Sequence, residues 1–156
     1  MGKGFCIAEQ GHVIHLIAPV NITAAATSEV FSMENWAHAT IIVYGGAGSS
    51  TTITVSECDD FTPTSSATIT YAYTQETTAA GDTQTAALAA AGTAGIGIGA
   101  ASGVYTIIEI DADELTDGMP CLQINLTDPG TGKLVSAAVI LSGGRYQEDV
   151  TSTVII

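Results

Sequence analysis

The chain has 156 residues, which suffices for one domain whose core needs neither metal nor disulfide. Its hydrophobic fraction is 46%, only 12% of residues are charged, and the net charge is −13, with Lys3, Lys133 and Arg145 as the fixed cations. Three scattered cations cannot neutralise a run of phosphates, so the composition argues against nucleic acid and against an anionic membrane surface as partners.

The N-terminal third predicts short strands and connections. Residues 5–18 form a broken strand pattern, and Pro19 is expected to limit pairing there. Residues 20–28 are expected to connect or to form an edge strand. Residues 29–33 alternate polar and apolar side chains, which is typical of a strand, and residues 35–38 predict a turn or a single helical turn.

The next segments predict a hairpin, a loop and another strand. Residues 39–44 form an apolar run that ends in the glycine-rich stretch 45–50, and residues 51–57 are the expected partner strand. Residues 59–64 carry turn residues and predict a loop. Residues 67–74 alternate with a period of two and predict one strand.

Residues 75–102 are rich in Ala, Thr and Gly, and we expect a long excursion with a short helix near 85–91 or a pair of weak strands. Residues 103–110 predict a strand. Residues 111–118 predict a short helical turn with Asp111 as its cap.

Strands are expected at residues 121–126 and 133–142, with a turn at 128–130 between them, and residues 153–156 could form a last strand. Many short strands with little helix are typical of a single all-β domain over residues 1–156. We therefore predict an antiparallel β-sandwich or jelly-roll-like fold.

Sequence motifs give little support for catalysis. The glycines of residues 95–99 lack the lysine of a phosphate-binding loop, and we find no nucleophile elbow or zinc-protease motif. His12 and His15 are expected on opposite faces of a strand, and His38 lies far away in sequence. The prediction is no enzyme, no cofactor and no catalytic residue.

Metal and redox sites are also not expected. Asp111, Asp113 and Asp117 could bind calcium, but the residues after them do not fit an EF-hand loop, so capping and solvation are favoured. Cys6, Cys58 and Cys121 are odd in number and lack a CxxC pair, which favours buried free thiols.

The N-terminal residues lack the long apolar run of a secretory signal, and no run approaches the ~18 apolar residues of a membrane span. We therefore expect a soluble protein synthesised in the cytoplasm.

Several residues are candidates for contacts between subunits. Phe31, Met33 and Trp36 form a dense apolar group, for which core packing is one interpretation and an interface anchor the other. The only arginine stands beside an aromatic residue, and the chain ends in apolar residues that need a strand partner. The predicted interface residues are Phe31, Trp36, Arg145, Tyr146, Ile155 and Ile156.

The chain resembles a known class of proteins in YTIIEIDADEL at 105–115, LQINL at 122–126 and AVILSGGRY at 138–146, with FSMENW at 31–36 and IIV at 41–43. These segments look like small structural proteins encoded near the capsid genes of tailed bacteriophages. The resemblance implies a decoration or cement protein on the capsid surface of the virion, commonly a homotrimer that binds the major capsid protein.

Three other functions stay open from the sequence. One is a neck, tail-tube or head-fibre component of the same particle. Another is a ligand- or carbohydrate-binding β-domain, with calcium bound through the 111–117 turn. The last is an enzyme whose site is assembled from distant residues.

Overall fold

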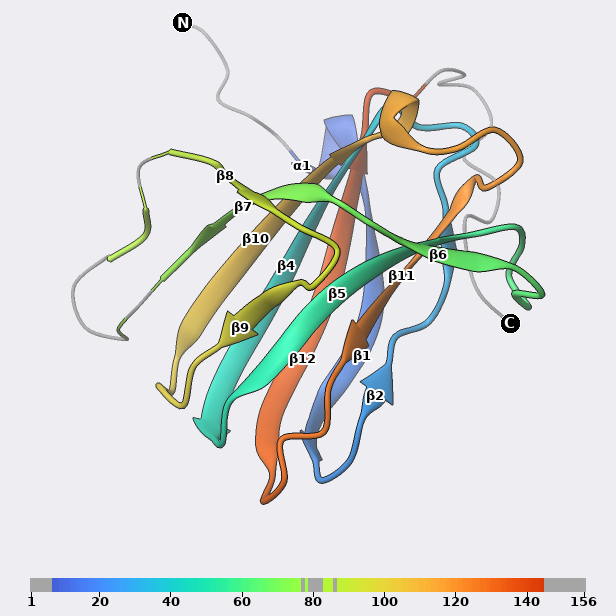
Figure 1. Cartoon of the computed structure of the whole chain (residues 1–156). Helices are drawn as coiled ribbons and strands as arrows, with labels where there is room; N and C mark the ends of the chain where they lie inside the picture. The colour runs from blue at the N-terminus through green and yellow to red at the C-terminus, as the bar shows by residue number, and fades with distance from the viewer. Residues whose placement is uncertain (1–6, 77, 79–82, 86, 145–156) are drawn as a thin grey trace, which may run out of the picture.

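The computed structural model describes residues 7–76, 78, 83–85 and 87–144. Two antiparallel sheets lie face to face around one hydrophobic core (Figure 1). The all-β sandwich expected from the strand pattern is thereby confirmed.

Sheet A contains the longest strands, in the order β1–β12–β4–β10–β7–β8. One helical turn, α1 (Ile7–Gln10), leads into it. Its strands are β1 (Gly11–Ile22), β12 (Lys133–Ser142), β4 (His38–Gly48), β10 (Val104–Asp111), β7 (Tyr71–Gln75) and β8 (Ala89–Ala91).

Sheet B has the order β2–β11–β5–β6, and two short strands pair beside this path, β3 with β11 and β9 with β5. Its strands are β2 (Ala26–Thr27), β3 (Phe31–Ser32), β5 (Thr51–Cys58), β6 (Ser66–Ile69), β9 (Ile96–Ile98) and β11 (Cys121–Leu126). A 3-10 turn, η1 (Ala112–Glu114), follows β10.

The core forms because every second side chain of the long strands points between the sheets. Each fully buried aliphatic side chain contributes roughly 1.5–3 kcal/mol by its removal from water. The central core residues are Ile41, Val43, Ile108, Ile110, Val139 and Leu141 from sheet A, and Ile53, Val55, Ile124 and Leu126 from sheet B.

The hairpin predicted for residues 39–57 is wrong. Both edges of β4 are occupied, by β12 and by β10, while β5 pairs with β11, β6 and β9 in the other sheet. The glycine-rich end of β4 and Ser49–Ser50 therefore carry the chain from sheet A to sheet B. A period of two predicts a strand but does not say which strand will be its partner.

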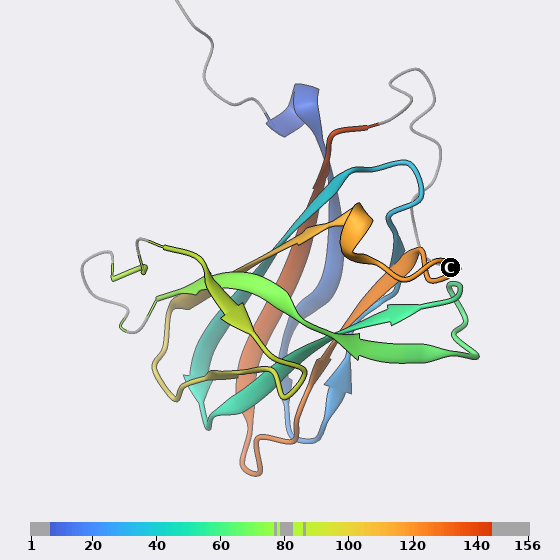
Figure 2. The same ribbon diagram turned by 45° about the horizontal axis from the view of Figure 1, so that its top comes forward.

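The single strand predicted for residues 67–74 is in fact two. The chain leaves β6 in sheet B and enters β7 in sheet A, with Thr70 at the break. Figure 2 shows this path crossing from one layer to the other. Alternation continues through the crossing, so the sequence pattern holds no sign of the change of sheet.

Pro19 limits strand pairing, as predicted, because Ala18 and Pro19 have no partner in β12 whereas Ile17 and Val20 do. β1 runs on to Ile22, with register irregularities between His15 and Ile17 and between Ile17 and Val20. β1 is an edge strand of sheet A, and proline is tolerated where one side of a strand needs no backbone donor.

The excursion at residues 75–102 contains a pair of short strands, which was one of the two alternatives that the sequence left open. β8 pairs with β7 in sheet A, and β9 pairs with β5 in sheet B. The excursion therefore closes one side of the sandwich.

No helix in the described part of the chain has the length and apolar character to cross a membrane.

Candidate interaction surface

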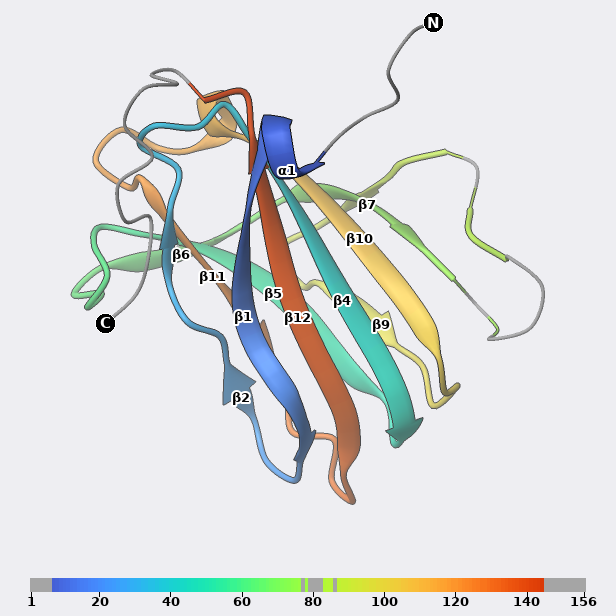
Figure 3. The same cartoon turned by 180° about the vertical axis from the view of Figure 1, so that it is seen from behind.

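The outer face of sheet A is the candidate functional site. In β4, β10 and β12, buried residues alternate with half-buried or exposed ones, and the latter point away from sheet B. Figure 3 shows β1, β12, β4 and β10 side by side, with no described element lying across them. This face is therefore open in the described molecule.

The side chains at its centre form an apolar patch, made of Val13, Ile42, Tyr44, Tyr105, Ile107, Leu134, Ala138 and Ile140. Val13, Tyr105 and Leu134 are 56%, 45% and 46% exposed. Leu134 lies over Gly46, where an added Cβ would stand 2.7 Å from the Leu134 Cβ. The glycine thus makes room for leucine on the surface.

Strand pairing arranges the outward side chains of sheet A in rows across the sheet. The rows, in the order β1, β12, β4 and β10, are Val13–Ile140–Thr40–Glu109 and His15–Ala138–Ile42–Ile107, followed by Ser136–Tyr44–Tyr105 on the last three strands. Apolar side chains in neighbouring rows make the patch continuous.

Tyr44 and Tyr105 are direct partners on β4 and β10. Their ring centroids are 5.3 Å apart with the planes tilted by 58°, a favourable aromatic geometry. Tyrosine is enriched at protein interfaces because one rigid side chain offers both apolar area and a hydroxyl. This pair is the most distinctive interface feature of the patch.

An ionic cluster marks one end of the same face. His38 bridges two carboxylates on β10, with Nδ1 2.6 Å from Asp111 Oδ1 and Nε2 2.7 Å from Glu109 Oε2. Thr40 Oγ1 also donates a hydrogen bond to Glu109 Oε2, at 2.7 Å. The strand register explains the cluster, since His38 pairs with Asp111 and Thr40 with Glu109.

The two carboxylates favour the protonated form of His38. Burial alone would lower the pKa of His38, but the hydrogen bonds to Asp111 and Glu109 and the negative charge of both carboxylates outweigh it. The pKa is therefore raised above the ordinary value of 6.5. The side chain is only 32% exposed, so this charge is partly shielded from water.

Lys133 lies at the opposite end of sheet A and is fully buried. Its Nζ donates hydrogen bonds to the carbonyl oxygens of Gly46 and Gly99, both at 2.7 Å, and of Ala101 at 3.2 Å. Burial lowers the pKa of Lys133. The ammonium group ties the start of β12 to the end of β4 and to the segment before β10, which is a structural role.

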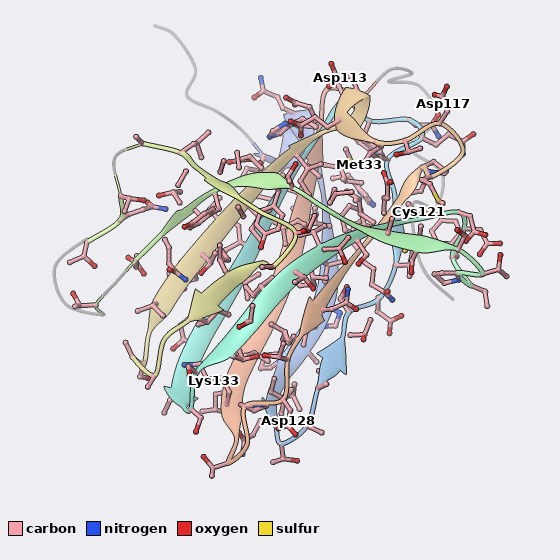
Figure 4. The ribbon with its side chains drawn as sticks, viewed as in Figure 1. Met33, Asp113, Asp117, Cys121, Asp128 and Lys133 are labelled. Carbon is pink, nitrogen blue, oxygen red and sulfur yellow. The ribbon has the colours of Figure 1, made fainter. Side chains whose placement is uncertain are left out.

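A cavity of about 230 Å³ lies at the other end of the sandwich, between Met33, Glu34, Ala112 and residues 115–120. Figure 4 shows Met33, Asp113 and Asp117 around this region, away from Lys133. The buried carboxylate of Glu57 holds its wall in place, because it accepts hydrogen bonds from Thr116 N at 2.9 Å and Thr116 Oγ1 at 2.8 Å. The bonded carboxylate has a structural role.

Two acidic residues of the 111–117 turn, Asp111 and Glu114, make contacts within the fold. Asp111 is the N-cap residue of η1, as predicted, and its carboxylate contacts His38. Glu114 accepts a hydrogen bond from Asp111 N at 3.1 Å. Among the described residues, no group of three or more His, Cys, Asp or Glu side chains could hold a metal ion.

Cys58 and Cys121 face each other across β5 and β11, and both are buried free thiols. Burial raises the pKa of Cys58 to about 11 and also raises that of Cys121. Such thiols remain protonated at neutral pH and are poor nucleophiles.

The structure places two of the residues predicted as interface contacts in the interior. Phe31 has no exposed surface and Trp36 is 7% exposed, with its ring stacked on His12 at 5.9 Å. Both side chains therefore belong to the core, which was the other interpretation of this apolar group. The other predicted interface residues lie outside the described part of the chain, and their role stays a prediction: Arg145, Tyr146, Ile155 and Ile156.

Sequence reasoning missed the apolar patch although a signal was present. Residues 39–44, 103–110 and 133–142 are apolar at both alternating sets of positions, rather than at one. Strands of this kind are typical of sheets that are covered on both faces. A two-layer sandwich covers only the inner face, so the second apolar face stays open in the described molecule.

Comparisons with known proteins add little to these observations. No protein family model and no curated protein matches the chain. Among solved structures, the chain is similar to the crystal structure of the SPBc2 prophage-derived protein YomS, with a TM-score of 0.48 and 13% identity over 85% of this chain and 95% of that chain. This likeness is too low to support an argument about function.

Proposed function

We propose that the chain is a structural protein of tailed-phage virions that decorates or cements the capsid shell through protein–protein contacts. The observation that carries the proposal is the apolar patch on the outer face of sheet A. Contiguous apolar surface of this kind on a rigid sheet marks an interaction site.

Three further features support assembly over catalysis. The patch lies on long paired strands, which keep its shape fixed without a ligand. The His38 side chain is held by two carboxylates, and the described cysteines are buried. The resemblance of residues 105–115 and 138–146 to phage structural proteins indicates the major capsid protein as partner and the capsid surface as location.

Co-sedimentation with capsid shells tests this function. The full chain is mixed either with shells assembled from the major capsid protein of the same genome or with the free capsid subunits. We expect saturable binding to shells and none to free subunits, because a cement protein binds the assembled lattice of subunits and not a subunit by itself. The purified protein should show no hydrolytic activity in parallel.

Electron microscopy of the same mixtures distinguishes the related alternative. Density spread over the whole shell supports decoration. Density at a single vertex overturns decoration in favour of a neck or head-fibre component, and absence of binding overturns the capsid role altogether.

A further inference from the structure

We propose that the outer face of sheet A pairs with the same face of a second copy, in a two-fold dimer. The apolar patch defines the surface that would be covered. This inference starts from the same patch as the proposed function and assigns it to a second copy of the chain. The chain would then meet the shell as a dimer, through its other surfaces, and not as the homotrimer that the resemblance implies.

The distribution of charge on the molecule favours a second copy as the partner of this face. The net charge is −13, and Lys133, the fixed cation among the described residues, is fully buried. Two copies therefore repel each other wherever carboxylates are exposed. On the outward positions of β1, β12, β4 and β10, carboxylates occur only at Glu109 and Asp111, at one end. A basic partner would find little to bind there, whereas a second neutral sheet face fits.

The size of the face is suitable for a dimer. Four strands about 4.8 Å apart, with about nine residues each at 3.3 Å per residue, cover on the order of 600 Å² in projection. The relief of the side chains makes the accessible area larger than the projection. It therefore approaches the roughly 800 Å² per partner of an ordinary specific interface.

Symmetry can also separate the acidic ends. A two-fold axis that lies in the interface and runs across the strands places the His38–Asp111 end of each copy over the Leu134 end of the other. Ala138 and Ile42 are the central outward positions of β12 and β4, so they lie near this axis. An isologous contact of this type is self-complementary and closes after two copies.

The same arrangement places two polar groups together. Tyr105 and Glu109 each lie two residues from Ile107 on β10, on opposite sides of the axis, so Tyr105 stands opposite Glu109 of the partner subunit. The phenol hydroxyl can then donate a hydrogen bond to that carboxylate, which keeps a covered charge satisfied.

Sedimentation velocity of the full chain and its variants tests the dimer. We expect the wild-type chain to be a dimer at micromolar concentration, and Tyr105→Glu to weaken association at least about tenfold, because it opposes two carboxylates in a covered site. The matched controls are Phe61→Glu and Leu88→Glu, since these apolar side chains are 46% and 58% exposed but lie off the patch. Both controls should dimerise as the wild type does.

A crosslink gives a result that does not depend on how well a charged variant folds. Ala138→Cys, in a Cys6→Ser background, should form a covalent dimer with a bismaleimide whose spacer spans the roughly 10 Å between packed sheets, whereas Thr62→Cys should not. A monomeric or trimeric wild-type chain, or equal crosslinking at both positions, would overturn the dimer.

Shell binding by the same variants separates the two proposals. Shell binding by a monomeric chain refutes the dimer but leaves the capsid function standing. A dimer that crosslinks through Ala138→Cys but does not bind shells supports the dimer and refutes the capsid function.

Discussion

His38 and Lys133 are cationic side chains in opposite environments at the two ends of sheet A. His38 is partly exposed and is held by carboxylates, whereas Lys133 is fully buried and contacts only neutral carbonyl groups. The pKa of His38 makes stability depend on pH, whereas the Lys133 ammonium group donates hydrogen bonds to three backbone carbonyl groups in two segments.

His38 should stabilise the fold more in mild acid than in base. Its pKa is raised in the folded state, so its contribution is fully present below the ordinary value of 6.5 and is lost as the pH rises through the folded pKa. Because the cluster is partly exposed, we expect His38→Gln to cost about 1 kcal/mol at pH 5.5 and less at pH 9. Urea unfolding at both pH values measures the difference.

His15→Gln is the control for this experiment, because His15 is exposed on the same sheet face. It should change stability little at either pH. If His38→Gln costs the same free energy at pH 5.5 and pH 9, the ion pairs do not contribute as described.

Lys133→Met should destabilise the fold by about 2–4 kcal/mol, because the buried carbonyl of Gly46 and the part-buried carbonyls of Gly99 and Ala101 lose a charged donor. Chemical unfolding measures this cost. Ser136→Ala, at an outward position of the same strand, should stay within about 0.5 kcal/mol of the wild type. A neutral effect of Lys133→Met would show that the segment before β10 is not held by this side chain.

At the scale of elements, the crossing from β4 to β5 decides the topology. Gly48 ends β4 with φ of +137°, and an added Cβ would clash with the carbonyl oxygen of Gly132. This close approach brings β4 against the start of β12, which fills one edge of β4. Because β10 fills the other edge, no edge of β4 is left for β5.

Gly48→Ala should therefore cost more than the ordinary strand substitution of glycine. We expect a loss of about 2–3 kcal/mol from the clash and the unfavourable φ. Thermal unfolding compares it with Gly97→Ala, where an added Cβ meets nothing within 4 Å. Equal melting temperatures for the two variants would contradict the crowding at the crossing.

Local elements were predictable where one physical signal governs them. The strands at residues 121–126 and 133–142 were predicted with the bounds that β11 and β12 have, because alternation and flanking turn residues are local. The partner of β5 and the break at Thr70 were not predictable, because competition for strand edges is a long-range property.

At the scale of the whole molecule, the two faces of sheet A have different roles. One face packs on sheet B, and the other carries an apolar patch in a strongly acidic chain. Copies of such a chain repel each other where carboxylates are exposed, and an apolar face without charge is suited to association.

Calcium should have no effect on the fold. The Asp111 carboxylate contacts His38, and the Glu114 carboxylate accepts a hydrogen bond from Asp111 N, so both carboxylates already have partners within the fold. We expect melting temperatures with calcium and with chelator to agree within about 1 °C, since a ligand stabilises only by preferential binding to the folded state. A clear rise with calcium would instead support the ligand-binding alternative.

The sequence by itself determined the all-β class, the acidic surface and most strand positions, because composition and alternation are local properties of the chain. It also placed Phe31 and Trp36 in one apolar group, but the tertiary structure put that group in the core. Only the tertiary structure decided that β4, β10 and β12 lie together with an open apolar face, and that His38 meets Glu109 and Asp111. Those outcomes depend on strand order and register, which are set by the packing of residues far apart in the chain.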